Sequence, residues 1–342
     1  MKRNIYDVAR NMNLSPGTIS KILNGKGNVS TKTRERVLKY VEEIGFTPNS
    51  SARTLKSKKS LTIGIVFSDI SNFGLEHPFF SSVLQQFKNY IEIFGYEIVF
   101  IVNRVGNYDL SYLKWCLVKN VDGVLIVTGN INKPNIIELV NSEIPTVSTD
   151  IKMDDLYSVM SDDFMGMKLG LEFALKLGLR KLACVSGPLT SRAFYERYLA
   201  FKEILEENNL TFKEKYFRVS PTYGFTGGYN ATKELLEEVK EAPDFIFALS
   251  DEIAYGVIRA LEDSGLKVPE DVSVIGYDDV SFSKHFTPAL TTIRQYKKEI
   301  GETAAKRLLA LIDGTVKPEK QVELIPVSLV IRDSTKKVNL KQ

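Results

Sequence analysis

Short apolar runs alternate with helix-length stretches from about Leu61 to the end of the sequence. The runs expected to form buried strands are 62–67, 97–102, 123–127, 146–148, 182–185, 245–249 and 272–277. The stretches between them include those with helical periodicity at 79–94, 165–177, 192–207, 252–263 and 299–312. Alternation of this kind is typical of doubly wound parallel sheets. The length allows two such sheets, with a break near 150–161 and a return near 290–293.

The first sixty residues differ from this pattern in charge. They contain 13 Lys and Arg against 4 Asp and Glu, a net charge of +9, whereas the whole chain carries +3 and the remainder therefore −6. A basic segment attached to an acidic body indicates a module that contacts phosphates. The asymmetry is more informative than the overall charge.

Three helices are expected in this basic segment. The periodic run from Ile5 to Met12 predicts the first, and Asn13 suits the turn that follows because asparagine tolerates left-handed backbone. Ser15 is a good N-cap for a second helix from Pro16 to about Asn24. A third helix is expected over about 32–44. Two helices joined by a short turn form the element that enters a major groove; the alternative is a generic three-helix bundle with a solvated basic face.

The residues from Thr47 to Lys59 form a second basic segment that follows Phe46. A helix of about eight residues is too short to be stable alone in water, so this segment is expected to order on DNA. Leu55 is a large apolar residue among Arg and Lys. As a wedge it could enter a minor groove, and Ala52 would allow two such helices to approach closely.

Several runs resemble the lactose/galactose repressor family of bacterial transcriptional regulators. They are Ile5–Ala9, Thr18–Gly25, Pro48–Asn49 and Ala52–Leu55 in the head, and Val185–Pro188, Glu196–Phe201, Leu249–Asp251, Ile275–Asp279, Pro288–Ile293 and Val330–Thr335 in the body. The resemblance covers the chain end to end. It implies a helix-turn-helix head, a hinge helix and a body of two subdomains resembling periplasmic binding proteins.

The resemblance also assigns DNA-binding roles to individual positions. Base reading falls on Pro16, Gly17 and Lys21. Backbone contacts fall on Tyr6, Ser15, Thr18, Ser20, Asn24, Asn28 and Thr33. The minor-groove hinge falls on Ala52, Leu55 and Lys56. Lys21 stands where arginine is usual, so it can reach guanine O6 and N7 without the planar fork.

Polar residues gather where the expected body strands end, which is where ligands bind in this architecture. For Asp69, Asp162 and Asp251 the capping of the following helix is an equal alternative, whereas Asp278 has no obvious helix after it. The resemblance places effector contacts on Phe80, Asp150, Arg197, Tyr223, Ser250 and Asp278. Carboxylates, an arginine and aromatic faces suit a polyol, although Arg197 could instead be a structural ion-pair residue.

Enzyme chemistry is not expected. His77 and His285 are the only histidines, and no phosphate-binding loop or dinucleotide fingerprint occurs, so we expect no catalytic residues, no cofactor and no metal. Cys116 and Cys184 lie in apolar runs and are interpreted as buried reduced thiols. Without a secretory or membrane-spanning stretch, the protein is expected to be cytoplasmic.

The domain organisation expected from these patterns has five parts. They are a head at 1–46, a hinge at 47–60, one subdomain at 61–160 plus 291–320, a second at 161–290 plus 321–335, and a tail at 336–342. The tail is too short for a tetramer-forming heptad repeat, so we expect a homodimer on a near-palindromic operator.

The leading hypothesis is a repressor of carbohydrate-utilisation genes switched by a small sugar-like effector. Two alternatives remain, regulation by a protein corepressor or a non-sugar ligand, and a solute-binding protein. The basic head and the missing signal sequence argue against the solute-binding protein.

Overall fold

The computed structural model describes residues 4–23, 27, 29–46, 59–68, 74–130, 133–317 and 321–337. The chain forms two compact units, Met1–Leu61 and Thr62–Gln342, and each is described by itself. None of the described helices is long and apolar enough to cross a membrane.

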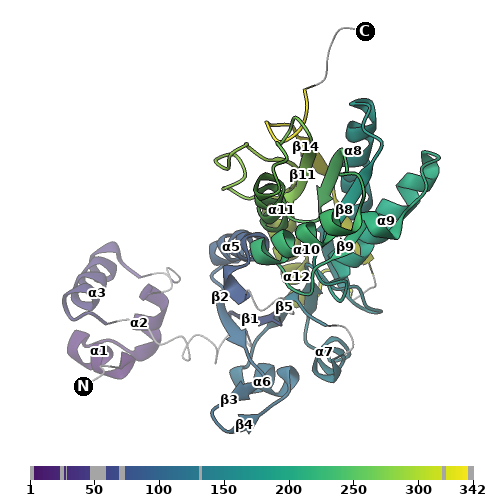
Figure 1. The fold of residues 1–342 in the computed structure, drawn as a ribbon. Helices are drawn as coiled ribbons and strands as arrows, with labels where there is room; N and C mark the ends of the chain where they lie inside the picture. Colours follow the sequence, from purple (N-terminus) through teal and green to yellow (C-terminus); the bar gives the residue numbers. More distant parts are fainter. Residues whose placement is uncertain are drawn as a thin grey trace. The chain divides into compact units, whose positions relative to one another are not determined.

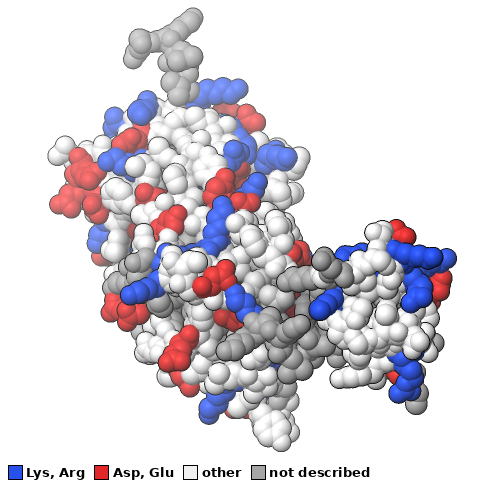
Figure 2. All heavy atoms as spheres, turned by 180° about the vertical axis from the view of Figure 1, so that it is seen from behind, with Lys and Arg blue, Asp and Glu red and all other residues white. Residues whose placement is uncertain are grey.

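The head unit is a bundle of α1 (Ile5–Met12), α2 (Pro16–Leu23) and α3 (Thr31–Glu43). Its core contains the buried side chains of Val8, Ile19, Ile22 and Val37. Asn13 adopts the left-handed conformation predicted for the turn, with φ 56° and ψ 44°. In Figure 2 Lys and Arg side chains lie along much of the visible edge of this unit, whereas both signs of charge are interspersed over the body.

The first sheet of the body is parallel throughout and has the order β13-β7-β6-β5-β1-β2. Its strands are β1 (Thr62–Phe67), β2 (Glu97–Ile101), β5 (Gly123–Thr128), β6 (Thr146–Ser148), β7 (Tyr157–Ser161) and β13 (Gln321–Ile325). Helices α6 (Tyr112–Lys119) and α7 (Pro134–Val140) pack together over one face. Helices α5 (Pro78–Ile93) and α12 (Lys297–Ile312) pack against each other, and α12 also contacts β5, β6 and β7. This sheet and its helices are called lobe 1.

Two small elements complete lobe 1. A 3-10 turn, η1 (Gly74–Glu76), precedes α5. A short hairpin of β3 (Arg104–Val105) and β4 (Tyr108–Asp109) lies beside α6 in Figure 1.

The second sheet has the order β14-β12-β11-β10-β8-β9, with only the edge strand β14 antiparallel to its neighbour. Its strands are β8 (Leu182–Ser186), β9 (Phe217–Val219), β10 (Phe245–Ala248), β11 (Ser273–Asp278), β12 (Thr291–Gln295) and β14 (Val327–Val330). Its helices are α8 (Asp163–Lys176), α9 (Arg192–Glu207), α10 (Phe225–Glu238) and α11 (Asp251–Asp263), and η2 (Glu214–Tyr216) precedes β9. This sheet and its helices are called lobe 2.

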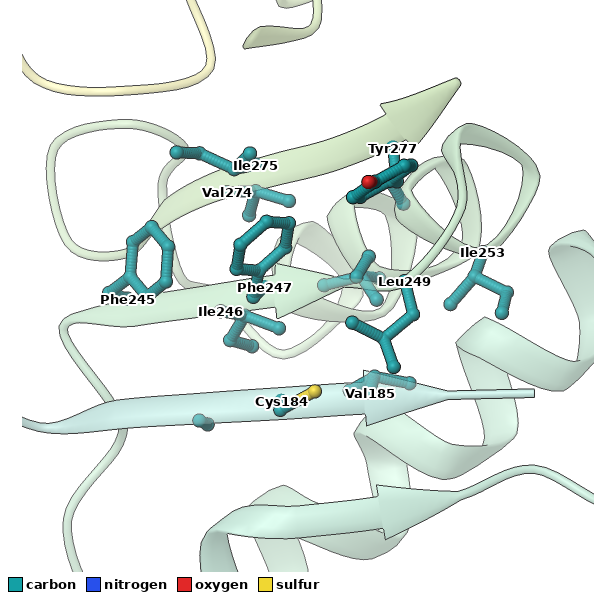
Figure 3. Packing of buried hydrophobic residues seen from close by; sticks show 14 of the residues in the cluster. Cys184, Val185, Phe245, Ile246, Phe247, Leu249, Ile253, Val274, Ile275 and Tyr277 are labelled. Atoms are coloured by element: carbon teal, nitrogen blue, oxygen red, sulfur yellow. The ribbon is translucent and has the colours of Figure 1, made fainter. Parts of the chain in front are cut away.

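The core of lobe 2 lies on both faces of the central strands. Figure 3 shows Phe247 of β10 and Tyr277 of β11 on the same side of the sheet, and their rings stack with centroids 6.5 Å apart. Helices α10 and α11 approach each other closely because Gly256 has no side chain: a Cβ there would lie 2.0 Å from the Phe225 carbonyl oxygen. Parallel strands that are buried on both faces explain the continuous apolar runs in the sequence.

The chain passes between the lobes three times, each time through a single residue. Asp162 separates β7 from α8, Tyr296 separates β12 from α12, and Pro326 separates β13 from β14. The backbone N–H of Asp162 donates to the Ile325 carbonyl, which ties two of these crossings together at 3.0 Å.

These crossings correct two of the expected subdomain boundaries. Residues 291–295 form β12 in lobe 2, although 291–320 was expected in the first subdomain, and residues 321–325 form β13 in lobe 1, although 321–335 was expected in the second. The physical reason is that an apolar run indicates a buried strand but carries no information about which sheet it joins.

Candidate DNA-binding face and ligand cleft

The exposed face of α2 carries the positions predicted to read bases. Gly17 and Lys21 are exposed and Pro16 is half-buried, while Ile19 and Ile22 point into the core. Among the predicted backbone contacts, Tyr6 and Ser15 are exposed and Thr18, Ser20 and Thr33 are half-buried. Asn24, Asn28, Ala52, Leu55 and Lys56 lie outside the described residues, so their roles stay predictions.

Two matched hydroxyl pairs order the beginnings of α2 and α3. The Ser15 hydroxyl accepts from the Thr18 backbone N–H at 3.1 Å and lies 2.8 Å from the Thr18 hydroxyl. Ser30 and Thr33 repeat this arrangement, with hydroxyls 2.8 Å apart. The capping role predicted for Ser15 is therefore present in the structure. The first turns of both helices contain no acidic residue, so these capped N-terminal ends suit phosphate binding.

A cleft between the two lobes encloses a cavity of about 50 Å³. The six positions predicted to contact an effector all line this cavity: Phe80, Asp150, Arg197, Tyr223, Ser250 and Asp278. Phe80 and Asp150 belong to lobe 1, and the other four belong to lobe 2. The carboxyl ends of strands in both sheets meet here, as the ligand rule for doubly wound sheets requires.

Arg192, the first residue of α9, joins the two lobes within the cleft. Its Nη2 lies 3.2 Å from Oδ1 of Asp150, and its Nε donates to the Asp150 carbonyl at 2.5 Å. Its Nη1 also pairs with Asp163 at 3.0 Å and with Glu196 at 2.5 Å. The Thr128 hydroxyl donates to the other Asp150 oxygen at 2.8 Å. Asp150 is thus a fixed carboxylate held from both lobes.

Arg197 is held rigidly beside this group. Its Nε donates to Asp163 at 2.8 Å, its Nη1 donates to the Leu249 carbonyl at 2.7 Å, and its guanidinium lies 3.5 Å from the centre of the Tyr277 ring. Burial alone would raise the pKa of Asp163, but the guanidinium groups of Arg197 and Arg192 lower it overall. Arg197 could be an effector contact or a structural ion-pair residue on sequence grounds. It forms the ion pair with Asp163, and it also lines the cavity.

Aromatic rings close the other side of the cleft. The His77 ring of lobe 1 stacks on the Tyr223 ring of lobe 2, with centroids 4.6 Å apart and an interplanar angle of 23°. Phe80 lies 4.6 Å from His77, and Phe194 lies 6.1 Å from Tyr223. Burial raises the pKa of the Tyr223 hydroxyl well above its usual value, which keeps it neutral. The cavity therefore combines aromatic faces with carboxylates and guanidinium groups.

Asp278 ends β11 in an uncommon backbone conformation, with φ 119°, and Asp279 follows with φ 50°. The Gln295 amide donates to Asp278 at 2.5 Å. Burial raises the pKa of Asp278, while the charges of Arg197 and Lys297 oppose that shift. Non-glycine residues at positive φ are costly and cluster at functional sites, so this strained turn supports a binding role.

The structure decides the role of two of the three aspartates for which capping and binding were equal alternatives. Asp162 is a cap, because its carboxylate accepts from the Met165 backbone N–H at 2.9 Å. Asp251 is neither cap nor lining residue; it is buried and accepts from Thr292 and Ser283, both at 2.5 Å. Ser250 caps α11 instead, and Asp69 lies outside the described residues.

Sequence reasoning missed Arg192, Asp163 and the stacking role of His77. One signal was available for Arg192: a cation in the first turn of a helix opposes the helix dipole, so an arginine there needs a partner. Asp163 directly follows Asp162, which caps α8, and no sequence pattern shows that the cap is Asp162 and the ion-pair partner is Asp163. Among the described residues, no cluster of His, Cys, Asp and Glu could hold a metal ion.

Comparison with known proteins gives consistent matches to both units. A family model described as "Bacterial regulatory proteins, lacI family" matches residues 4–49, and one described as "Periplasmic binding protein-like domain" matches residues 171–335. Catabolite control protein A of Priestia megaterium is 33% identical over 341 residues, which cover 98% of this chain and 100% of the relative.

Two solved structures extend the match to three dimensions. A Lac repressor dimer bound to operator and the anti-inducer ONPF superposes with a TM-score of 0.82 at 28% identity, over 98% of this chain and 99% of that one. A LacI family regulator from Enterococcus faecium with bound ribose has a TM-score of 0.67 at 31% identity, over 80% of this chain and 98% of that one. With a helix-turn-helix head and a two-lobed body matched over nearly the whole length, the chain belongs to the LacI family of bacterial transcriptional regulators.

Proposed function

We propose that the protein is a dimeric, sequence-specific repressor of carbohydrate-utilisation genes whose operator affinity is switched by a sugar-like effector in the cleft. The observation that carries the proposal is the meeting of six positions from both lobes around one cavity. The Enterococcus faecium relative binds ribose, which supports a sugar for this chain. The protein would act in the cytoplasm, where its operator lies, and we expect no catalytic activity.

The chemistry of the cleft supports a ligand rich in hydroxyl groups. Asp150 and Asp278 are fixed acceptors: Asp150 receives donors from Thr128 and Arg192, Asp278 receives one from Gln295, and each carboxylate retains further lone pairs. Phe80 and Tyr223 offer apolar faces to the C–H side of a sugar ring. Because these groups come from both lobes, a bound ligand would contact both and bias their relative orientation.

DNA recognition by the head follows from the exposed face of α2. We propose that Lys21 reads one base in each half-site, that Pro16 and Gly17 allow close approach, and that Leu55 kinks the centre of the operator. The hydroxyl-capped helix ends, together with the predicted backbone contacts, would fix the head on phosphates. Specificity then depends on few side chains and on DNA shape.

The effector is tested by thermal unfolding against a panel of sugars and sugar phosphates. A ligand at 100 times its dissociation constant adds about 2.7 kcal/mol to the free energy of unfolding, so a true effector gives a clear shift. The shift should disappear in Asp278→Asn and persist in Glu234→Gln, an exposed carboxylate on α10. A ligand that stabilises both variants equally does not bind in the cleft.

Operator binding is the second part of the test. The effector should change operator affinity by about 1–3 kcal/mol of coupling, measured by fluorescence anisotropy at fixed salt. If no member of the panel changes operator affinity, regulation by a protein corepressor or a non-sugar ligand replaces the sugar proposal. A protein that binds sugars but no DNA at low salt would instead be a solute-binding protein.

A further inference from the structure

A second cavity, larger than the first, lies in lobe 2 away from the cleft. Its volume is about 660 Å³, within the range of small-molecule sites. It is bounded by the start of β8, the second half of α9, the loop before η2 and the residues that follow α10. Because it touches the amino end of β8, it lies at the edge of the sheet opposite the cleft. The two cavities share no lining residue.

The floor of this cavity is apolar and well packed. Leu182, Phe201 and Leu205 are buried beneath it. Phe212 meets Phe201 edge to face, with centroids 6.3 Å apart and an interplanar angle of 80°, and it remains half-buried. Tyr216 adds a second half-buried ring. An apolar body seated on this floor would cover aromatic and aliphatic surface now open to water.

The rim of the cavity is strongly basic. Five cations and one acid lie on it: Arg180, Lys181, Lys213, Lys215, Lys240 and Glu241. This local excess of positive charge stands in a body whose net charge is negative. A basic rim on an acidic domain is not explained by overall composition.

Two of these cations already have protein partners. Lys181 pairs with Glu241 at 2.8 Å, and the hydrogen bond and the charge of Lys181 together lower the pKa of Glu241. Arg180 donates to two backbone carbonyls, those of Leu175 and Leu179. Arg180 and Lys181 therefore already bind groups of the protein itself.

The remaining three lysines differ. Within the described part of the chain, Lys213, Lys215 and Lys240 form no ion pair, and Lys215 lies 5.4 Å from the centre of the Tyr216 ring. Ammonium groups on flexible stems are effective point-charge ligands for phosphate and carboxylate. All three line the cavity that has the apolar floor, an arrangement that favours a ligand with an anionic end and an apolar body.

We propose that this cavity is a second ligand site, which binds a small amphipathic anion with an aromatic or aliphatic body and a terminal phosphate or carboxylate. The apolar body contacts Phe212 and Tyr216, and the anionic group is held by Lys213, Lys215 and Lys240. The site is independent of the effector proposed for the cleft.

The test uses isothermal titration calorimetry on the full chain with 4-nitrophenyl phosphate as the probe. Inorganic phosphate carries only its charge, and 4-nitrophenol carries only its ring. We expect 4-nitrophenyl phosphate to bind at least about tenfold more tightly than either, because only it engages both floor and rim. Equal binding of phosphate and 4-nitrophenyl phosphate, or no heat at about 10 mM probe, would overturn the proposal.

Charge-reversal variants locate the binding. Lys213→Glu combined with Lys240→Glu changes two exposed residues and should weaken binding by about tenfold or more without changing the melting temperature. The control is Lys267→Glu with Lys284→Glu, which makes the same charge change at exposed positions of lobe 2 outside the cavity. Equal losses in both double variants would show non-specific attraction and refute the site.

A third variant separates the two cavities. Asp278→Asn alters the cleft and should leave the affinity for 4-nitrophenyl phosphate unchanged. Loss of probe binding in this variant would place the probe in the cleft and contradict the proposal. Failure of the sugar panel would leave this result intact, so the two proposals fail separately.

Discussion

Arg192 and Asp150 form an ion pair that joins the two lobes of the body. Nη2 of Arg192, at the start of α9, lies 3.2 Å from Oδ1 of Asp150, which follows β6. Both side chains are largely buried, with 18% and 9% of their surfaces exposed. A buried charge pair is expensive to break by removing one partner, because the other charge is left without compensation.

Replacing Arg192 with alanine should therefore destabilise the body by about 3 kcal/mol, since Asp150 and Glu196 lose their shared partner. The matched control is Lys152→Ala, which removes a bridge to Glu196 that is 2.6 Å long but whose lysine is 39% exposed. That change should cost at most about 1 kcal/mol. Urea unfolding monitored by circular dichroism measures both, and equal costs would show that Arg192 does not hold the lobes.

Lys21→Ala should relax base preference at one position of each half-site by about 1–3 kcal/mol. Lys21 is the exposed cation on the recognition face of α2, so its loss removes a base contact as well as a charge. The measurement compares operator variants substituted at single positions, at constant salt. If affinity falls uniformly over all sequences, including random DNA, Lys21 contacts only phosphate.

Leu55→Ala should weaken operator binding far more than binding to random DNA. A side chain inserted between base pairs contributes to binding only where the duplex is kinked, and only the operator is expected to be kinked in the complex. Gel-shift titrations on operator and scrambled duplexes give the ratio directly. A parallel loss on both duplexes would remove Leu55 from the proposed wedge position.

The stability of the body should rise as the pH falls from 8 towards 5. Burial, together with the charge of Asp278, raises the pKa of Asp251 to about 7. Between the ordinary aspartate value and this one the folded protein binds more protons than the unfolded chain, so the ionised form costs stability at higher pH. We expect a gain on the order of 1–3 kcal/mol.

Asp251→Asn should reduce this pH dependence, because asparagine does not titrate, whereas Asp278, whose pKa is also raised by burial, still contributes in the same direction. The control is Asp279→Asn: the pKa of Asp279 is lowered by its ion pairs with Arg294 and Arg332, so this group titrates below the window. Thermal melts at several pH values would contradict the prediction if wild type and Asp251→Asn kept the same slope.

Local chemistry made the head predictable from its sequence. Asn13 tolerates left-handed backbone, and its N–H donates to the carbonyl of Arg10, three residues earlier. Ser15 caps α2 by accepting from the N–H of Thr18, three residues later. Interactions of such short range are encoded in neighbouring residues, which is why turn and cap could be placed without tertiary information.

The cleft was predicted in part. The six positions carried over by resemblance meet in one cavity, but the partners that fix them did not follow from the sequence. Arg192 and Asp150 are separated by 42 residues, and Arg197 and Asp163 by 34. Such pairs depend on how the strands are ordered within each sheet. Because the sequence does not give this strand order, β12 and β13 were expected in the wrong subdomains.

The single-residue crossings at Asp162, Tyr296 and Pro326 limit how the lobes can move. Consecutive Cα atoms are about 3.8 Å apart, so a one-residue connection allows almost no translation. Rotation of one lobe against the other about the region of the three crossings is the motion that remains. In such a rotation each atom moves in proportion to its distance from the crossings. A rotation of a few degrees on ligand binding would therefore move the far ends of the lobes the most.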